Sequence, residues 1–353
     1  MSRPIDRVIF VPMSFSVSVV IPTFNRCALI GATLDSVLAQ SHPAAEIVVV
    51  DDGSTDSTEN LIRRQYPSVR YIKIPNSGPP GARNVGVAAT QSEWIAFLDS
   101  DDLWEPGKLQ AHARLAELSP EVPYSFSNFR IVEGERWRQS TKFDATPAGY
   151  FDVRGYRPAP GFLVCAEPMV ARLLRSQPVF PSTVLLTRQF FEKVGPWDET
   201  LGRTRSEDLD FALRCVAHAP IGIVEAPLVG IRKHAANYSG NLLRTLRGQI
   251  EILQRFEARG GLPADTLPIL REEIVMRSKD ALDTAFSLGE FGQLRELVRL
   301  VPSCELRGKL WLKSVIGRCP APLNGWGRSI LLAGSRTRGK ILRQQIDKTA
   351  ARP

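Results

Sequence analysis

The chain has 353 residues, of which 43% are hydrophobic and 23% are charged. These values are typical of a globular protein with one large and one smaller domain, and they exclude a disordered or collagen-like chain. The net charge of +8 is confined to one end, because the segment from Glu305 to Pro353 holds eleven basic and two acidic side chains. A basic partner surface is therefore expected only in the C-terminal tail.

No paired spacing separates the cysteines, which are Cys27, Cys165, Cys215, Cys304 and Cys319. This pattern excludes a zinc motif and a disulfide framework, and it favours a reducing cytoplasm. No run of 18 apolar residues occurs, so no transmembrane helix is predicted. The first strand follows Met13 directly, and residues 1–12 are predicted to be a disordered leader, with Met13 as the alternative natural start.

Strands and helices alternate over the first hundred residues. Apolar, β-branched runs predict strands at 16–21, 46–50, 69–74 and 94–98. Helical spacing of apolar residues predicts helices at 29–40 and 58–66, and another from residue 82 onward. This order predicts a parallel α/β sheet.

Three carboxylates, Asp99, Asp101 and Asp102, follow the strand at 94–98. On an extended backbone Asp99 and Asp101 would lie on the same side, about 7 Å apart, within reach of one ligand. Like charges at that distance need a cation, such as a divalent metal that also binds phosphate. Ligands of open parallel sheets bind at the carboxyl ends of strands. The alternative is a solvated turn, since Asp and Ser are common in turns.

The sequence NSGPPGARNVGVAAT, from Asn76, predicts a loop that leads into a helix. Its backbone N–H groups could hold phosphate, with Arg83 adding charge. The spacing of its glycines fits neither the dinucleotide fingerprint nor the nucleotide P-loop.

In the middle of the chain, the spacing of apolar residues predicts helices at 106–118 and 188–194, short strands within 124–143 and a strand at 179–186. Residues 144–160 are expected to be a loop-rich stretch. In RTRSEDLDFALRC, Ser206 is a candidate N-cap, with Glu207 and Asp208 in the first helical turn. Acids are favoured there by the helix dipole alone. A strand is expected at 221–226, and His234 follows it, with an ordinary surface histidine as the alternative.

Beyond Ser239 the β-branched strands stop. Helical spacing predicts helices at 242–259, 267–286, 291–301 and 306–316. The last 25 residues combine basic side chains with apolar pairs and are a candidate contact for anionic lipid on the inner face of the membrane, a solvated helix face being the alternative. No nucleic-acid-binding module is recognisable in this tail.

Together these stretches resemble the family 2 glycosyltransferases of the GT-A type. The resemblance covers residues 16–239 and rests on ordered motifs: SVVIPTFNR, SVLAQSHP, VVVDDGSTDST, GPPGARNVG, WIAFLDSDDLW, VGPWDETL, SEDLDFALR and IRKHAANYSG. It implies an α/β fold, with a Rossmann-like, mostly parallel sheet flanked by helices. The catalytic domain would span residues 13–239, and residues 240–353 would form a helical region with a basic tail.

The resemblance also implies a nucleotide site. Pro22, Thr23 and Phe24 would line the base, although Phe24 stands where many relatives have Tyr. Asp52 would bind the base, with Asp51 close by. Arg83 would lie beside the base or the diphosphate.

The metal and catalytic residues follow from the same resemblance. Asp99 and Asp101 form the DxD pair, with Asp101 as the direct ligand of Mg²⁺ or Mn²⁺ and Asp99 nearer the ribose; Asp102 is a weaker candidate. His234 matches a histidine near the metal or diphosphate in some relatives. Asp208, paired with Glu207, matches the catalytic base of inverting members.

The implied reaction moves a sugar from a nucleotide-diphosphate sugar, a UDP-sugar above all, to a hydroxyl of a polysaccharide, a lipid-linked glycan or another cell-surface glycan. Two alternatives remain open. A glycoside hydrolase would also use two carboxylates, placed across a sugar and without a metal. A non-catalytic module would bind the sugar nucleotide or act as a scaffold.

Overall fold

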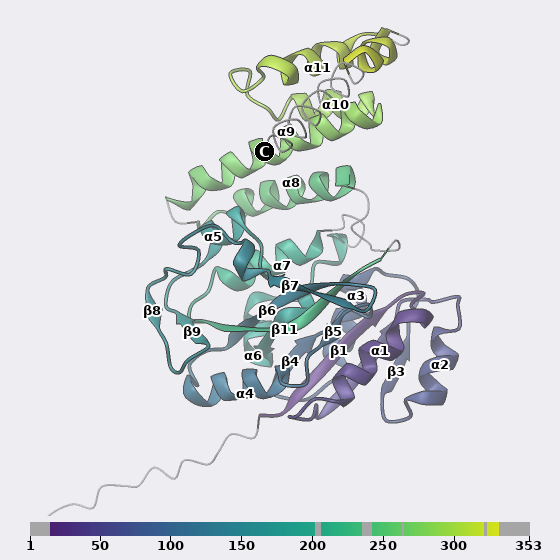
Figure 1. The fold of residues 1–353 in the computed structure, drawn as a ribbon, viewed down its shortest axis with the longest axis vertical. Coiled ribbons are helices and arrows are strands. Elements are labelled where there is room, and N and C mark those ends of the chain that lie inside the picture. Colours follow the sequence, from purple (N-terminus) through teal and green to yellow (C-terminus); the bar gives the residue numbers. More distant parts are fainter. Residues whose placement is uncertain (1–14, 202–205, 235–241, 263–264, 321–322, 332–353) are drawn as a thin grey trace, which may run out of the picture. The chain divides into compact units, whose positions relative to one another are not determined.

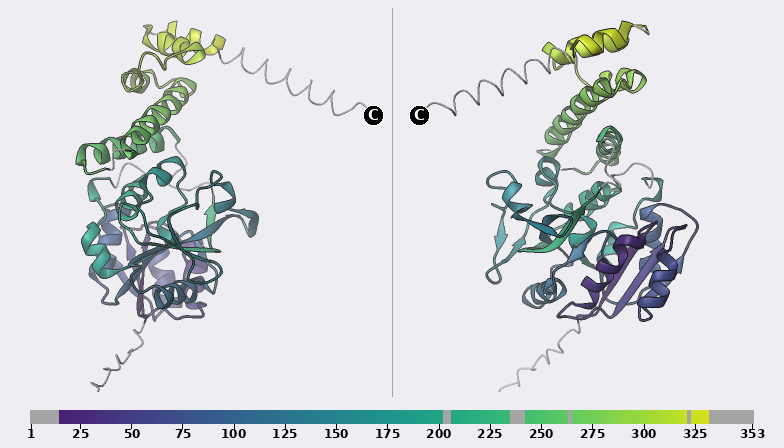
Figure 2. Two further views of the ribbon diagram at one scale, coloured as in Figure 1. Left: turned by 90° about the vertical axis from the view of Figure 1, so that its left-hand side faces the viewer. Right: turned by 45° about the vertical axis from the view of Figure 1, so that its right-hand side comes forward.

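The computed structural model describes residues 15–201, 206–234, 242–262, 265–320 and 323–331 (Figures 1 and 2). The chain divides into two compact units. The first comprises Met1–Met169, Ser176–Gly202 and Phe211–His234, and the second comprises Val170–Arg175, Arg203–Asp210 and Ala235–Pro353. The predicted leader and the last 22 residues of the basic tail lie outside the described residues.

A mixed sheet forms the centre of the first unit (Figure 1). Its strands are β1 (Val17–Thr23), β2 (Glu46–Asp51), β3 (Arg70–Lys73), β4 (Trp94–Phe97), β5 (Leu103–Trp104), β6 (Tyr124–Glu133), β7 (Arg136–Thr141), β8 (Gly155–Tyr156), β9 (Phe162–Cys165), β10 (Val184–Thr187) and β11 (Ile221–Lys233). They follow the order β3-β2-β1-β4-β10-β6-β11-β9-β8, with β5 beside β11 and β7 beside β6.

The β3-β2-β1-β4 half of the sheet is parallel, as predicted. Every residue of β1 and β4 is buried, which fits apolar strands covered on both faces. The helices of this half are α1 (Cys27–Leu38), α2 (Thr58–Gln65) and α3 (Pro79–Ala88). Because parallel strands end at the same edge, the segments that follow β1, β2 and β4 meet there.

The other half departs from a parallel arrangement. β10 runs antiparallel to both β4 and β6, whereas β11 runs parallel to β6. The strand predicted at 179–186 begins as a 3-10 turn, Pro181–Thr183, and pairs only from Val184. The strand predicted at 221–226 continues to Lys233 across register irregularities near Pro227. The α/β class with a helical C-terminal region is confirmed.

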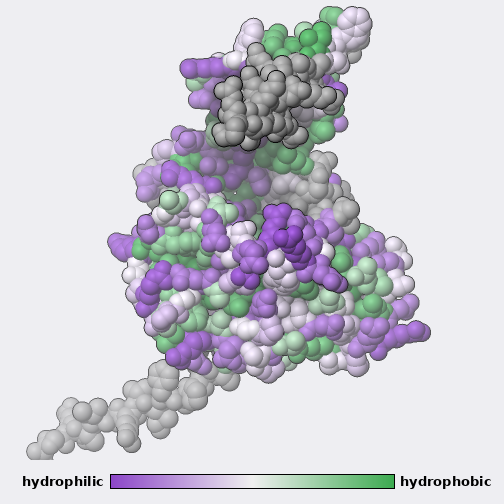
Figure 3. Space-filling model, in the orientation of Figure 1, coloured by the Kyte–Doolittle hydropathy of each residue, from purple (hydrophilic) through white to green (hydrophobic). Residues whose placement is uncertain are grey.

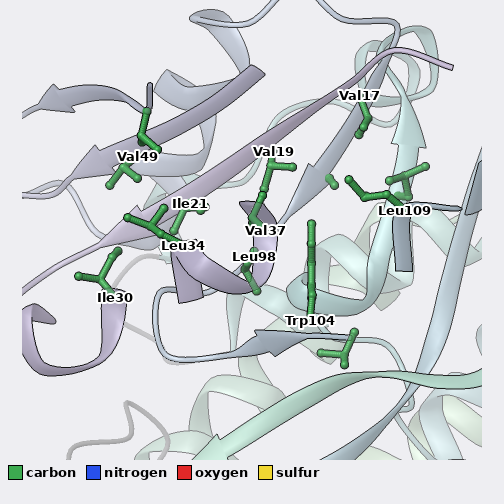
Figure 4. Packing of buried hydrophobic residues seen from close by; sticks show 14 of the residues in the cluster. Val17, Val19, Ile21, Ile30, Leu34, Val37, Val49, Leu98, Trp104 and Leu109 are labelled. Atoms are coloured by element: carbon green, nitrogen blue, oxygen red, sulfur yellow. The ribbon is translucent and has the colours of Figure 1, made fainter. Parts of the chain in front are cut away.

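Apolar side chains from β1, β4 and α1 form a common core (Figure 4). Val19, Ile21, Leu34 and Leu98 in this cluster are fully buried. Burying each such side chain stabilises the fold by about 1.5–3 kcal/mol. On α3, Gly86 permits a close approach to the sheet, because a Cβ there would lie 2.3 Å from Cγ1 of Val20. These contacts hold the segment after β4 against α1 and fix α3 on the sheet.

Helices dominate the second unit. They are α5 (Val170–Arg175), α8 (Leu242–Arg259), α9 (Thr266–Leu288), α10 (Phe291–Val298) and α11 (Gly308–Arg318), and residues 323–331 are also helical. The four long helices agree with the predicted ranges to within two or three residues at each end. Within the described ranges, no helix is long and apolar enough to cross a membrane.

The remaining helices are α4 (Lys108–Leu118), α6 (Arg188–Val194) and α7 (Glu207–Val216). Residues 207–210 of α7 belong to the second unit and the rest of this helix to the first. The domain boundary between residues 239 and 240 stays a prediction.

Candidate active site

The acids that follow β4 form a tight turn. The backbone N–H of Asp102 donates to the carbonyl of Asp99 at 2.9 Å and closes the turn over residues 99–102. The Thr33 hydroxyl of α1 lies 3.0 Å from the carbonyl oxygen of Ser100 and 2.9 Å from that of Asp102. The prediction of an extended backbone at Asp99 and Asp101 is therefore wrong, because β4 ends at Phe97 and strand alternation does not apply to a turn.

Asp99 is paired with a buried arginine. Nη2 of Arg83, on α3, donates to Oδ1 of Asp99 at 2.7 Å, and Arg83 is only 3% exposed whereas the Asp99 side chain is 32% exposed. The guanidinium of Arg83 lies over the indole of Trp197, 4.4 Å from the ring centroid. Trp197 in turn stacks on Phe211 at 4.0 Å. Asp99 is therefore held on one side and open to a ligand on the other.

Asp101 is surrounded by basic groups. Its Oδ2 lies 3.0 Å from Nε2 of His234 and 3.5 Å from Nε of Arg26. His234 directly follows β11 and Arg26 follows β1, so three segments far apart in the sequence meet at this carboxylate. The structure thus brings together Asp101 and His234, two of the predicted metal ligands, and adds Arg26, which the sequence did not indicate.

Asp102 is buried and has its own partners. Oδ2 accepts a hydrogen bond from the Ser182 hydroxyl at 2.6 Å, and Oδ1 accepts one from the backbone N–H of Arg232 at 3.1 Å. Burial, and then the negative charges of Asp101 and Asp99, raise the pKa of Asp102 well above its usual value. These contacts tie the acidic turn to the 3-10 turn before β10 and to β11, so Asp102 supports the site from within the fold.

Arg232 reinforces the same connection. Its Nε donates to the carbonyl of Asp101, and its Nη2 donates to the Thr33 hydroxyl at 2.7 Å and to the carbonyl of Leu29 at 3.0 Å. The side chain therefore joins β11, α1 and the acidic turn. Arg232 lies on β11 because this strand continues to Lys233, beyond its predicted end at residue 226.

The two acids after β2 have different environments. Asp51 is fully buried, and its carboxylate accepts hydrogen bonds from the backbone N–H of Ser54 at 2.6 Å and from the Tyr71 hydroxyl at 2.5 Å. Burial and the bond to Asp51 raise the pKa of the Tyr71 phenol. Asp51 therefore shapes the loop after β2 from within the fold.

Asp52 joins that loop to the start of α3. Its carboxylate accepts hydrogen bonds from the backbone N–H groups of Ser77 at 2.6 Å and Gly78 at 2.9 Å. A carboxylate offers about four acceptor positions, so these bonds leave capacity for a donor on a ligand.

The end of β1 and the residue that follows it present one polar and one aromatic group. Pro22 and Thr23 are buried, and within the described residues the Thr23 hydroxyl has no hydrogen-bond partner. A buried hydroxyl without a partner is costly, so a polar ligand atom would stabilise it. Phe24 is 44% exposed, and the next residue, Asn25, has a left-handed φ of 51°. The Asn25 side chain accepts a hydrogen bond from the backbone N–H of Thr55 at 2.8 Å, which fastens this loop to the loop after β2.

Glu207 and Asp208 begin α7, in the part of this helix that belongs to the second unit. Glu207 is buried and Asp208 is half-buried. Ser206 directly precedes the helix, but its hydroxyl donates to the carbonyl of Thr245. Asp210, one turn further, accepts a hydrogen bond from Arg259 at 3.0 Å. The assignment of Asp208 as the base stays a prediction.

Several site residues were absent from the sequence interpretation. Arg26, Ser182, Trp197 and Arg232 gain their roles from long-range contacts. Arg26, Trp197 and Arg232 stand inside motifs that carry the resemblance, SVVIPTFNR, VGPWDETL and IRKHAANYSG, but these motifs did not indicate their contacts. No local pattern distinguishes Ser182, because its significance comes from accepting the Asp99 N–H at 3.1 Å while donating to Asp102.

Comparison with known proteins places part of the chain in a family. Residues 18–173 match the model of glycosyl transferase family 2. Over 122 residues the chain is 42% identical to an uncharacterised glycosyltransferase of Nostoc sp., covering 33% of this chain and 38% of that protein. Over 118 residues it is 38% identical to the Escherichia coli UDP-Glc:alpha-D-GlcNAc-diphosphoundecaprenol beta-1,3-glucosyltransferase WfaP, covering 33% of this chain and 46% of that protein. The matched segments thus span less than half of these relatives.

A solved structure shares the fold. The S. aureus TarS fragment 1–349 superimposes with a TM-score of 0.59 at 20% identity, covering 94% of this chain and 92% of that one. The ordered motifs, the sheet with its acidic turn and the family match lead to one conclusion: residues 18–173 form a glycosyl transferase family 2 domain, and the chain has a GT-A type fold.

Proposed function

We propose that the chain transfers a sugar from a nucleotide-diphosphate donor to a hydroxyl of a cell-surface glycan, with inversion at the anomeric carbon. One observation carries the proposal: the acidic turn after β4 pairs Asp99 with Arg83, and Asp101 with His234 and Arg26. This turn lies at the carboxyl end of a parallel strand, where open α/β sheets bind ligands. Alternating carboxylates and cations at such an edge suit a metal-bound diphosphate.

The donor proposed is a UDP-sugar. The relative WfaP is named for transfer from UDP-Glc, and TarS, which shares the fold, was crystallised with UDP and with UDP-GlcNAc. In this chain the exposed ring of Phe24 would stack on the base. The Thr23 hydroxyl, which has no partner among the described residues, would donate a hydrogen bond to the base, and the Asp52 carboxylate would accept one from it. Pro22 would complete this wall.

A divalent ion at this site would be held by protein side chains together with phosphate oxygens of the donor. Among the residues that the structure describes, no three His, Cys, Asp or Glu side chains converge on a point that could hold a metal. Asp101 and His234 nevertheless fit Mg²⁺ or Mn²⁺, because such ions often take one or two protein ligands and the remainder from substrate phosphates. Once bound, the ion would stabilise the charge that develops on the leaving diphosphate.

The other groups would then position the donor. Arg83 holds Asp99 at 2.7 Å and would keep its free oxygen directed at the ribose. Arg26, beside Asp101, would contact the diphosphate as a further cation. The Ser182, Arg232 and Asp102 contacts would keep the turn rigid during these events, since positioning error costs rate steeply.

The acceptor hydroxyl is a poor nucleophile at neutral pH. A carboxylate within hydrogen-bond reach must take its proton as the oxygen attacks the anomeric carbon. We assign this role to Asp208, with Glu207 beside it, because the SEDLD motif matches the family pattern there. A single displacement of this kind inverts the anomeric centre.

The domain plan follows from the same proposal. Residues 13–239 would form the catalytic domain, and residues 240–353 a helical region with a basic tail. The wide, unpaired spacing of the five cysteines in the sequence supports a cytoplasmic location. Peripheral contact with the inner face of the membrane would bring the enzyme to a lipid-linked acceptor.

Ligand-induced stabilisation tests the proposal. The unfolding temperature of the full chain would be measured with UDP, GDP and CDP, each with Mn²⁺ or with EDTA. A ligand at 100 times its dissociation constant stabilises the native state by about 2.7 kcal/mol, so a clear rise is expected for UDP with Mn²⁺ and not with EDTA.

Variants sharpen this test. Asp101→Asn should remove the effect of Mn²⁺, whereas Asp265→Asn, at the exposed residue that directly precedes α9, should preserve it. No response to any nucleotide would instead favour the non-catalytic module, and cleavage of glycosidic bonds in EDTA would favour the hydrolase.

A further inference from the structure

The last two helices that the structure describes direct large apolar side chains to solvent. Trp311, Leu312 and Val315 are exposed on α11, and Leu323, Trp326 and Ile330 are exposed on residues 323–331. Trp311 is 54% exposed, Trp326 72% and Ile330 73%. At 3.6 residues per turn, each set of three falls on one side of its helix. These six side chains are termed the apolar face, and hydrophobic residues are visible at the top of Figure 3, where both helices lie.

Packing on other sides of the two helices fixes this orientation. Gly317 of α11 lies against α10 so closely that a Cβ would come within 2.4 Å of Cδ2 of Leu294. Gly327 lies against α11, where a Cβ would meet Ile316 at 2.8 Å. Arg328 donates to the carbonyl of Ser287, at the end of α9. The apolar face is therefore the side that remains once both helices have packed on the unit.

Basic side chains surround the apolar face. Arg307, Lys309 and Arg318 are exposed at its margins, and Glu305 is the only acid from residue 305 to residue 331. Lys313, on the inner side of α11, forms an ion pair with Asp283. The sequence of residues 332–353 adds six further basic residues and one acid. The composition is thus that of an interfacial helix, with tryptophan and aliphatic groups in the middle and cations beside them.

We propose that the apolar face docks on the surface of an anionic membrane. Tryptophan favours the boundary between headgroups and acyl chains, and lysine and arginine favour anionic lipid. A second copy of the chain fits less well, because two such faces would bring like charges together without acids to balance them. The proposal concerns a surface apart from sugar transfer and does not depend on the donor or acceptor.

The two kinds of side chain predict separable effects. Each Lys or Arg near an anionic surface adds about 1 kcal/mol, so Lys309→Gln with Arg318→Gln should weaken vesicle binding about 30-fold. Trp311→Gln with Trp326→Gln removes both aromatic anchors and should weaken binding at least about tenfold, at low and at high salt alike. Raising the salt concentration should reduce mainly the contribution of the basic side chains.

Co-sedimentation with vesicles tests the proposal on the full chain, without donor or acceptor. Vesicles of phosphatidylcholine containing one quarter phosphatidylglycerol should bind the protein, and pure phosphatidylcholine should bind it far less. Met276→Gln, which changes an exposed apolar residue on α9, is the matched control and should bind as the unmodified chain does. Because all these positions are exposed, unchanged circular dichroism should show that the fold persists.

Three outcomes would overturn the proposal. Full binding by the Trp311→Gln, Trp326→Gln variant would assign the interaction to the tail alone. Equal binding to neutral and anionic vesicles would remove the role of the basic margin. Absence of vesicle binding, together with a dimer or larger assembly that the same variant converts to a monomer in sedimentation velocity, would assign the face to a second copy of this chain.

Discussion

Replacing Lys108 with methionine should stabilise the protein, and the gain should decrease as the pH rises. Lys108, on α4, is fully buried. Its Nζ lies 3.4 Å from Nε2 of His112 and 4.6 Å from the centroid of the Trp104 ring. Within the described residues no carboxylate forms an ion pair with it. Burial alone lowers the pKa of Lys108 to about 7.

The sign follows from proton linkage. Between pH 7 and the ordinary lysine pKa of 10.5, the unfolded chain binds a proton at this position that the folded chain does not, so the free energy of unfolding rises with pH. The lowered pKa corresponds to about 4 kcal/mol of lost stability at pH 7 and about 2 kcal/mol at pH 9. Methionine fills a similar volume and has no such cost. Burial and Lys108 also lower the pKa of His112, whose contribution appears below pH 6.5.

Urea unfolding at pH 7, 8 and 9, followed by circular dichroism, measures this difference. The stability of Lys108→Met minus that of the unmodified chain should fall by about 2 kcal/mol between pH 7 and pH 9. Subtracting the two stabilities cancels the pH dependence that comes from the ionisable groups present in both proteins. Lys193→Met, at an exposed position on α6, should show no pH-dependent difference. A Lys108→Met variant that is less stable by the same amount at every pH would refute the reasoning.

Three further substitutions test the proposed base, the packing of α3 on the sheet and the support of the acidic turn. Asp208→Asn should abolish transfer while the UDP-induced rise in unfolding temperature survives, and unchanged turnover would disprove the assignment of the base. Gly86→Ala should cost about 1–3 kcal/mol in calorimetry, because the new Cβ would overlap Val20, whereas Gly107→Ala, with no atom within 4 Å of its Cβ, should cost far less. Thr33→Val should lower the free energy of unfolding by about 1–3 kcal/mol and weaken UDP binding, because it removes the hydroxyl that contacts the acidic turn and Arg232. Equal UDP affinity in the variant would show that the turn needs no such support.

The parallel half of the sheet was accessible from sequence because each strand is a short apolar run buried on both faces. β1, β2 and β4 have that pattern, and α1 and α2 show helical spacing of apolar residues between them. The direction of β10 was not accessible, because an apolar run has the same appearance in a parallel and an antiparallel neighbour. β9 is only four residues long and follows the predicted loop-rich stretch, so no periodicity marks it.

The candidate site shows the same division. Motifs alone led to the prediction of Asp99, Asp101 and Asp208, since acids after a strand or at a helix start are visible locally. The turn geometry was missed because it depends on Thr33, 66 residues before Asp99, and on the Ser182 and Arg232 contacts far beyond it. The apolar face was missed for a similar reason, because helical spacing identifies a stripe but does not reveal whether the fold covers it.

The anomeric configuration of the product tests the central claim most directly. The full chain would be incubated with Mn²⁺, an α-linked UDP-sugar and an acceptor library, and the product would be examined by nuclear magnetic resonance while UDP release is measured. The account predicts UDP release that requires both acceptor and metal, and a β-linked product. An α-linked product, or sugar release that continues in EDTA without a nucleotide donor, would contradict it.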